Sequence, residues 1–418
     1  MARRQDGKTA RLIFVSLAVL PSCHLVAQAT IHAQAIPLVT RAWHTPGDKP
    51  RTEFALVQPA LMVEWEQPMP ASMEAAPHFS ARLTLDGEGL TIPDGELAPG
   101  DYGEGFYDRR HPHTYVHELM LSGSDLLGRL DGALRLSLSV GKGFVAFGSD
   151  DPMSRPVVRY PVDHHLAQIL ERGVLIGRAA YGPIGLEVTG FDGDEPTKPS
   201  DWPNISRGLD SRAVRLTVTP FEGLEAQYSW ARVKSPEHRA GAGPTQRKRS
   251  ASLRWAGSVA HRPGYALVEW ARTEEAGGLF TFHALVAEGA MSVGRSRPYF
   301  RFERTDRPED TRTADPFRSV RPPLDNSLIG ITRWTVWTAG YGVSLLTARG
   351  RLEVRPFVEG SLASVQANEG IFDPKTFYGS DVLPSVTVGV RMDWGGMSGM
   401  RMGRYGAGGT HMASMEMQ

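Results

Sequence analysis

The stretch from Asp108 to Glu118 holds the residues of this chain that are best suited to chemistry. It reads Asp-Arg-Arg-His-Pro-His-Thr-Tyr-Val-His-Glu, with three histidines among its 11 residues. Pro112 fixes its own φ and biases His111 toward an extended shape, so we expect an elbow where a loop enters a strand. Imidazole and carboxylate groups bind transition metals such as zinc and copper. Their concentration in this stretch predicts a metal site.

A second pair of histidines is expected to approach the same rim of the fold from a neighbouring strand. The candidate metal ligands of the two stretches are Asp108, His111, His113, Glu118, His164 and His165. Asp108 could instead orient an imidazole without touching the metal, and Glu118 could pair with Arg135 across a strand ladder. The competing interpretation is a polar loop whose histidines cap strands or bond the backbone.

Composition and motifs exclude some classes of function. The chain has 418 residues with 46 basic and 46 acidic side chains, which argues against nucleic acid as a partner, because proteins that bind it carry a basic excess. Nucleophile and nucleotide-binding motifs such as Gly-x-Ser-x-Gly and the P-loop do not occur in the sequence. We therefore expect no bond-making catalysis.

The first 35 residues have the pattern of a secretory signal peptide. A basic start is followed by an apolar stretch at 12–20 and by two small-x-small cleavage motifs, which end at Ala29 and Ala35. The single cysteine, Cys23, lies in this region, so the mature chain is expected to have no disulfide. The next segment, 36–78, shows no clear pattern beyond a candidate strand at 53–66.

Apolar and polar residues alternate along many segments of residues 79–394. Val214, Leu216 and Val218, for example, interleave with polar residues, and a period of two places each set on one face of a sheet. In a soluble sandwich the apolar set would face a core, whereas in an outer-membrane barrel it faces lipid and the polar set lines the lumen. The signal peptide, aromatic residues near strand ends and alternating short and long connections favour the barrel.

We predict an all-β antiparallel transmembrane barrel of about 14 strands (roughly 12–16), with short periplasmic turns and long external loops. Its last strand should end at Trp394, where the barrel-assembly machinery commonly recognises an aromatic residue. Glu118 should face the lumen, because a carboxylate that faces lipid is costly, and His117 has the opposite parity and should face outward. The Met/Gly-rich tail, 395–418, should be mobile, although its methionines could alternatively bind Cu(I).

Asp-Arg-Arg-His-Pro-His at 108–113, followed by Glu118, resembles a segment of a bacterial outer-membrane β-barrel family with an Asp-Arg-x-His-Pro-His motif. The resemblance continues through His164-His165, Gly190-Phe-Asp-Gly-Asp-Glu-Pro196, Leu209-Asp-Ser211 and Lys234-Ser-Pro-Glu237. It implies a metal-related role, since the family is associated with copper-handling gene sets, and it implies the same six candidate ligands. The chain departs from the family pattern at Thr114 and Asp163, where an aspartate and a glycine are expected.

Three functional hypotheses follow from the sequence. The first is an outer-membrane barrel, embedded in the lipid bilayer, that binds or passes a transition-metal ion, with copper foremost and zinc next. The second is a small-solute porin with structural histidines, which would favour anions if Arg135, Arg215, Arg254 and Arg301 line its lumen. The third is a metal-dependent outer-membrane hydrolase with Glu118 as general base.

Overall fold

The computed structural model describes residues 28–45, 47–68, 76–92, 113–127, 134–162, 164–196, 198–236, 241–310, 328–348, 352–396 and 401–406. The strands are β1 Gln28–Ala42, β2 Arg51–Glu66, β3 His78–Asp86, β4 Val116–Ser124, β5 Leu134–Gly143, β6 Arg172–Tyr181, β7 Ile184–Phe191, β8 Ser211–Phe221, β9 Leu224–Lys234, β10 Thr245–Val259, β11 Arg262–Glu275, β12 Phe280–Met291, β13 Ser296–Asp310, β14 Leu328–Val343, β15 Leu346–Ala348, β16 Leu352–Gly370 and β17 Val382–Trp394. The helices are α1 Glu88–Thr91, α2 Pro374–Tyr378 and the short 3-10 helices η2 Pro152–Ser154, η3 His164–Leu166 and η4 Ala276–Gly278.

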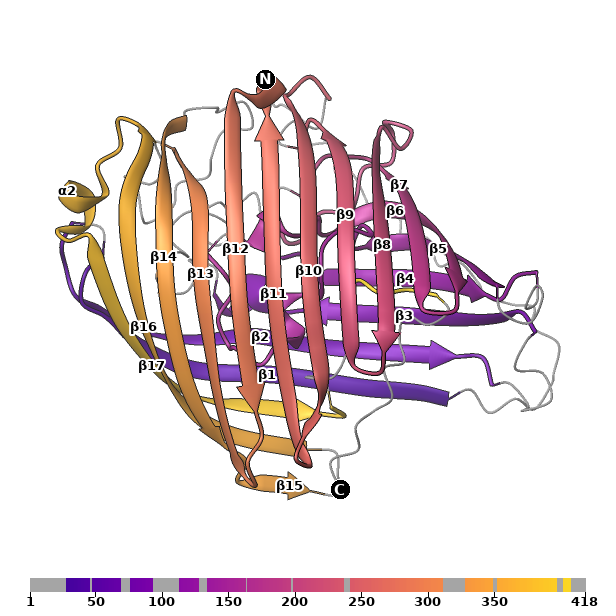
Figure 1. Ribbon diagram of the computed structural model, residues 1–418, viewed down its shortest axis with the longest axis horizontal. Helices are drawn as coiled ribbons and strands as arrows, with labels where there is room; N and C mark the ends of the chain where they lie inside the picture. Colours follow the sequence, from indigo (N-terminus) through magenta and orange to yellow (C-terminus); the bar gives the residue numbers. More distant parts are fainter. Residues whose placement is uncertain are drawn as a thin grey trace, which may run out of the picture.

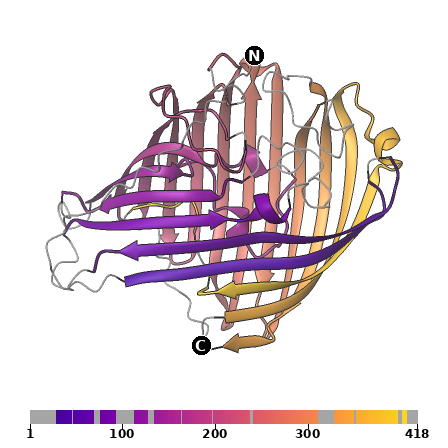
Figure 2. The same cartoon turned by 180° about the vertical axis from the view of Figure 1, so that it is seen from behind.

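These strands form one antiparallel sheet that closes on itself. Each strand pairs with its neighbours in the chain, and β1 pairs with β2 on one side and with β17 on the other. The three residues of β15 lie beside the start of β16, so the 17 strands of the described residues make a barrel of 16 full-length strands. Figure 1 shows β8 to β14 as the near wall of the barrel, and Figure 2 shows β1 to β4 on the opposite wall.

Alternation along the strands separates an apolar outside from a charged inside. On β7, Leu186 and Val188 are 43% and 51% exposed on the outer face, whereas Glu187 and Thr189 are 3% and 1% exposed on the inner face. A sandwich would have buried the leucine and valine between two sheets. The predicted antiparallel barrel is therefore confirmed. Among the described residues, no helix has the length and apolar character needed to cross a membrane.

The predicted number of strands and the predicted start of the barrel both need correction. All 14 predicted strands are present, and β2 confirms the candidate strand at 53–66. With β1, which was not predicted, the number of full-length strands is 16. The barrel thus begins at Gln28 rather than at residue 79, and β1 includes residues 28–35, which were assigned to the signal peptide. Small residues that alternate with glutamine suit both a cleavage site and a strand, and this ambiguity explains the difference.

Connections differ between the two ends of the barrel, as the sequence predicted. At one end, the turn end, β6 and β7 are joined by residues 182–183, and β8 and β9 by residues 222–223. At the other end, the loop end, residues 144–171 join β5 to β6 and fold into the barrel as an inner loop. The amide N–H of Val162 in this loop donates to the carboxylate of Glu303 on β13 at 2.8 Å, which ties the loop to the far wall.

Part of the predicted mobile tail has a defined position in the structure. Residues 401–406, which we call the C-terminal segment, lie inside the barrel, where Met402 and Tyr405 are 1% and 4% exposed. The prediction of a mobile tail is wrong for this segment, because its two arginines and its tyrosine find carboxylate partners on the inner wall. The remaining residues of 397–418 lie outside the described residues.

An arginine on the outer belt should destabilise the barrel according to its depth. Leu216 is in the middle of β8 and 40% exposed on the outer face, and Phe221 ends the same strand. We expect Leu216→Arg to lower the free energy of unfolding by about 2–4 kcal/mol in lipid, and Phe221→Arg by only about 0–1 kcal/mol. Urea unfolding in lipid vesicles measures both values. Equal costs at the two positions would argue against a lipid-facing belt.

Candidate functional site

A β-bulge at His117 turns two consecutive side chains into the barrel. Thr84 of β3 pairs with Glu118 and Leu85 pairs with Val116, so His117 is an extra residue on β4. His117 and Glu118 are both completely buried inside the barrel. The prediction that His117 faces outward is therefore wrong, because it assumed a strict alternation that the bulge interrupts.

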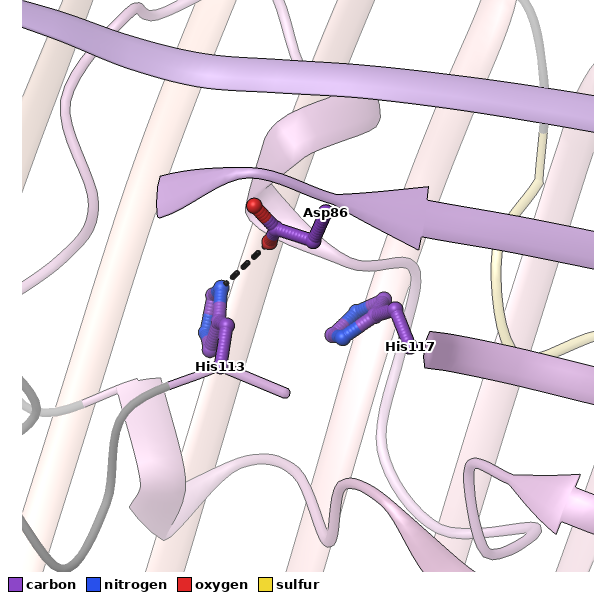
Figure 3. A group of neighbouring side chains, drawn as sticks. All are labelled: Asp86, His113 and His117. Carbon is purple, nitrogen blue, oxygen red and sulfur yellow. Dashed lines mark hydrogen bonds and ion pairs between the residues drawn. The ribbon is translucent and has the colours of Figure 1, made fainter. Parts of the chain in front are cut away.

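Asp86, His113 and His117 form a compact group on the inner wall (Figure 3). Nδ1 of His113 lies 3.0 Å from Oδ2 of Asp86, and the two imidazole ring centroids are 5.1 Å apart. One potential ligand atom from each residue lies within 4.8 Å of the other two. The chain brings the group together where β3 ends and β4 begins, since the amide of Asp86 donates to the carbonyl of Tyr115 at 3.1 Å.

Two further carboxylates hold the imidazoles in place. Oε2 of Glu88 lies 3.1 Å from Nδ1 of His113, and Oε1 of Glu171 lies 2.6 Å from Nδ1 of His117. Burial would lower the pKa of His113, but the hydrogen bonds and charges of Asp86 and Glu88 outweigh it and raise this pKa well above its usual value. Burial would raise the pKa of Glu171, but His117 reverses the effect and lowers it to about 2. The group is thus built to hold positive charge.

The free nitrogen of His117 suits a metal ion. Nε2 of His117 is buried and has no hydrogen-bond partner within the part of the chain that the structure describes. In the neutral imidazole, Nδ1 donates its proton to Glu171 and Nε2 carries the lone pair, and a carboxylate in this position is the usual support of a metal-binding imidazole. Bonds of about 2 Å in a tetrahedral site place ligands about 3.3 Å apart, whereas the candidate ligand atoms of this group lie within 4.8 Å of one another. A metal ion would therefore have to draw the three side chains together and replace the proton between His113 and Asp86.

The predicted ligands are only partly brought together. His113 belongs to the group, whereas Asp108 and His111 lie outside the described residues. His164 and His165 belong to η3, which packs against β11 and β12, on the wall opposite β3 and β4. The expectation that the two histidine pairs share one rim site is therefore not met by His165, because the inner loop carries it across the barrel.

Glu118 is occupied by other partners and is not part of the metal group. Its Oε2 accepts a hydrogen bond from Thr84 at 2.6 Å, and its Oε1 accepts one from Tyr405 at 2.6 Å. Arg82 lies 3.6 Å away, so the predicted pairing with Arg135 is replaced by one with Arg82. Arg135 pairs with Asp125 at 2.8 Å. These contacts argue against Glu118 as a ligand or as the general base of a hydrolase.

Sequence reasoning missed Asp86, Glu88 and Glu171 and misplaced His117. Asp86 and Glu88 lie 27 and 25 residues before His113 and carry no motif, so only the pairing of β3 with β4 reveals them. Glu171 directly precedes β6, and its carboxylate also accepts the backbone N–H of Thr114 at 2.9 Å. The sequence offered one indication of Glu171, namely a charged residue directly before the strand that leaves the loop end of the barrel.

The barrel interior holds many arginine–carboxylate pairs rather than charges of one sign. The four arginines predicted to line the lumen do face inward, and each lies against a carboxylate: Arg135 with Asp125, Arg215 with Glu187, Arg254 with Asp150, and Arg301 with Glu288. A lining that favours anions needs uncompensated positive charge. These pairs therefore remove the basis for the predicted preference for anions.

Side chains and the inner loop fill much of the described part of the lumen. The arginines that face it are among the largest fully buried side chains, and Arg215, Arg301 and Arg391 are each less than 2% exposed. The inner loop covers them: Nη1 of Arg301 donates to the carbonyl of Arg159 and Nη1 of Arg391 to the carbonyl of Arg155 at 2.9 Å. In an open pore, water would reach these guanidinium groups, which it does not do in the part of the chain that the structure describes.

Comparison with known proteins places the fold. No family model matches the chain, and no curated protein sequence matches it. Solved structures do match: the anion-selective porin from Comamonas acidovorans has a TM-score of 0.50 at 10% identity and covers 88% of this chain and 100% of its own. This is a porin-type barrel fold. OmpT, an outer membrane protein of Vibrio cholerae in its trimer form, has a TM-score of 0.51 at 9% identity and covers 88% of this chain and 99% of its own. The outer membrane channel DcaP of Acinetobacter baumannii has a TM-score of 0.50 at 9% identity and covers 88% of this chain and 97% of its own.

Proposed function

We propose that this chain is an outer-membrane channel of the porin type for small polar solutes, and that the filled lumen is its closed state. The observation that carries the proposal is the closed barrel with an apolar outer face and a charged inner face. The porin-type fold supports it, and so does the inner loop, which narrows the lumen from within. Insertion would depend on the barrel-assembly machinery, with Trp394 at the end of β17 as the recognised residue.

Conductance tests this function directly. We expect purified, refolded protein to give discrete but small current steps in planar bilayers, because buried arginines and the inner loop leave little open cross-section. Under a salt gradient the reversal potential should stay near zero, since Arg215, Arg254 and Arg301 are each paired with a carboxylate. A large reversal potential toward anions would restore the anion-selective alternative. Protein that inserts in folded form yet carries no current in any condition or variant contradicts the channel.

A second function is favoured by the group of Asp86, His113 and His117. We propose that it binds one transition-metal ion with nitrogen and oxygen ligands, a donor set that suits Cu(II) or Zn(II). The unpaired Nε2 of His117 is the observation that supports it. Equilibrium dialysis of the folded protein against each metal, followed by elemental analysis, should give one tightly held ion per chain. The absence of any bound ion would leave the group as a hydrogen-bonded brace.

A further inference from the structure

Arg401 of the C-terminal segment inserts between two acidic side chains of the barrel interior. Its Nη2 lies 2.7 Å from Oδ1 of Asp150 in the inner loop, and its Nη1 lies 2.7 Å from Oε2 of Glu225 on β9. Further hydrogen bonds from Nε to Asp150 at 3.0 Å and from Nη2 to Glu225 at 2.8 Å complete the contact. The guanidinium is therefore held by two carboxylates at once through charge-assisted hydrogen bonds, which are stronger than hydrogen bonds between neutral groups.

Arg404 and Tyr405 extend the same contact along the wall. Nη2 of Arg404 donates to Oε1 of Glu225 at 2.8 Å and also to the side chain of Gln227. The hydroxyl of Tyr405 donates to Glu118 at 2.6 Å and accepts from the backbone N–H of Phe144 at 3.0 Å. These contacts tie the segment to β4, β9 and the start of the inner loop.

The carboxylates depend on this segment for their charge balance. Every ion pair of Glu225 among the described residues is made with Arg401 or Arg404. Asp150 keeps only Arg254 of the barrel wall if the segment leaves. Burial would raise the pKa of Asp150, but Arg401, Arg254 and Arg404 hold it far below its usual range, so the carboxylate is ionised at neutral pH. An emptied site would leave two buried carboxylates with only Arg254 beside Asp150. Because burial disfavours the charged form of a carboxylate, a cationic partner is needed to keep both ionised.

We propose that Asp150 and Glu225 form a binding site for guanidinium-bearing cationic ligands, such as arginine-containing peptides, and that the C-terminal segment occupies it as an internal ligand that closes the channel. The inference rests on the proposed channel function for its effect on current, but not for the binding itself. A cavity of about 190 Å³ adjoins Arg401 and Arg404 and reaches the β6–β7 turn at Gly182 and Pro183, so a ligand has room to approach from the turn end.

The length of the link between β17 and Arg401 determines how strongly a free ligand must compete with the C-terminal segment. Six residues separate Trp394, the last residue of β17, from Arg401, so the segment can only sample the space near the turn end of the lumen. A short link of this kind gives an effective concentration on the order of millimolar. Free ligand at micromolar concentration should therefore fail to bind the wild-type chain, yet bind a variant in which the internal arginines are lost.

The test uses the full-length double variant Arg401→Gln with Arg404→Gln. Its matched control is Arg262→Gln with Arg295→Gln, which removes two exposed arginines from the turn end. The probe is a labelled peptide with the sequence of residues 398–406, Ser-Gly-Met-Arg-Met-Gly-Arg-Tyr-Gly, and its own control carries glutamine in place of both arginines. Fluorescence anisotropy measures binding, planar bilayers measure current, and heat-modifiable migration confirms that each variant is folded.

We expect the arginine peptide to bind the double variant at least tenfold more tightly than it binds the wild type or the control variant, and to reduce a current that is severalfold larger than that of the wild type. Equal binding to all three proteins, or equal binding of the two peptides, would overturn the site. A variant that binds the peptide while its current equals that of the wild type would overturn closure by the segment. If no protein conducts, the channel function fails, and the anisotropy result still decides the site.

Discussion

A chain that begins at Ile36 is expected to fail to form the barrel, whereas a chain that begins at Thr30 should fold. Residues 33–35 of β1 pair with Trp394, Asp393 and Met392 of β17, and residues 28–34 pair with β2. Removing them leaves the facing backbone groups of β2 and β17 without partners at the seam. Each unpaired group costs several kcal/mol in a lipid environment, where water cannot replace the lost bond. The loss of several such bonds is therefore as large as the whole stability of a typical protein, about 5–15 kcal/mol.

Gln34 adds a side-chain reason for the same result. Its amide donates to Gln58 at 2.7 Å and accepts from Nη2 of Arg391 at 2.6 Å, so it joins β1, β2 and β17 on the inner face. Removing Gln34 leaves the buried guanidinium of Arg391 short of a partner. The seam of the barrel therefore loses both its backbone ladder and an internal polar contact.

Heat-modifiable migration after refolding distinguishes the two chains. The chain from Thr30 should show a heat-sensitive compact band, and the chain from Ile36 should migrate as unfolded protein before and after heating. Sequencing the exported protein gives an independent reading, since cleavage after Ala29 keeps nearly all of β1 and cleavage after Ala35 removes its first half. A compact, heat-sensitive band from the shorter chain would show that β1 is dispensable.

The barrel was largely predictable because each of its strands carries its own pattern. A period of two in segments such as residues 214–218 needs no partner to be recognised, and it fixes the fold class and which side chains face outward. β1 was not recognised because the alanine and glutamine residues in its first half resemble a cleavage region, although Ile31 and Val39 are exposed on its outer face as in a lipid-facing strand. The alternation of residues also could not predict the bulge at His117, because the bulge depends on the pairing register between β3 and β4.

The metal group and the site of Asp150 and Glu225 were less predictable, because the residues that meet in them are distant in sequence. Asp150 and Glu225 meet Arg401 across 251 and 176 residues, and no local pattern reports such a contact. Low sequence complexity suggested a mobile tail, yet charge decides the position of the C-terminal segment. His113 could be selected because histidines and carboxylates cluster around it, whereas Glu171 is recognised only when the inner loop brings it to within 2.6 Å of His117.

Replacing His117 with alanine should weaken binding of Cu(II) or Zn(II) by more than about 100-fold. The variant removes one of three ligands, and the loss of a group that only supports a ligand already costs about 10–100-fold. Glu171→Gln keeps all three ligands but takes the charge from the acceptor of Nδ1 of His117, so its loss should lie within that smaller range. Asp86→Asn should resemble His117→Ala, because Asp86 supplies the only carboxylate of the group. Competition against a chromophoric chelator measures each affinity.

His283→Ala is the matched control, since His283 is exposed on β12 and far from the group. Its affinity should equal that of the wild type, and all variants should keep heat-modifiable migration. The graded order, with Glu171→Gln between the control and His117→Ala, is what separates a metal site from a structural brace. A brace would lose stability with each variant but show no ordered change in affinity. Equal affinity in His117→Ala and His283→Ala would place any bound metal elsewhere in the chain, and the unpaired Nε2 would then need another explanation.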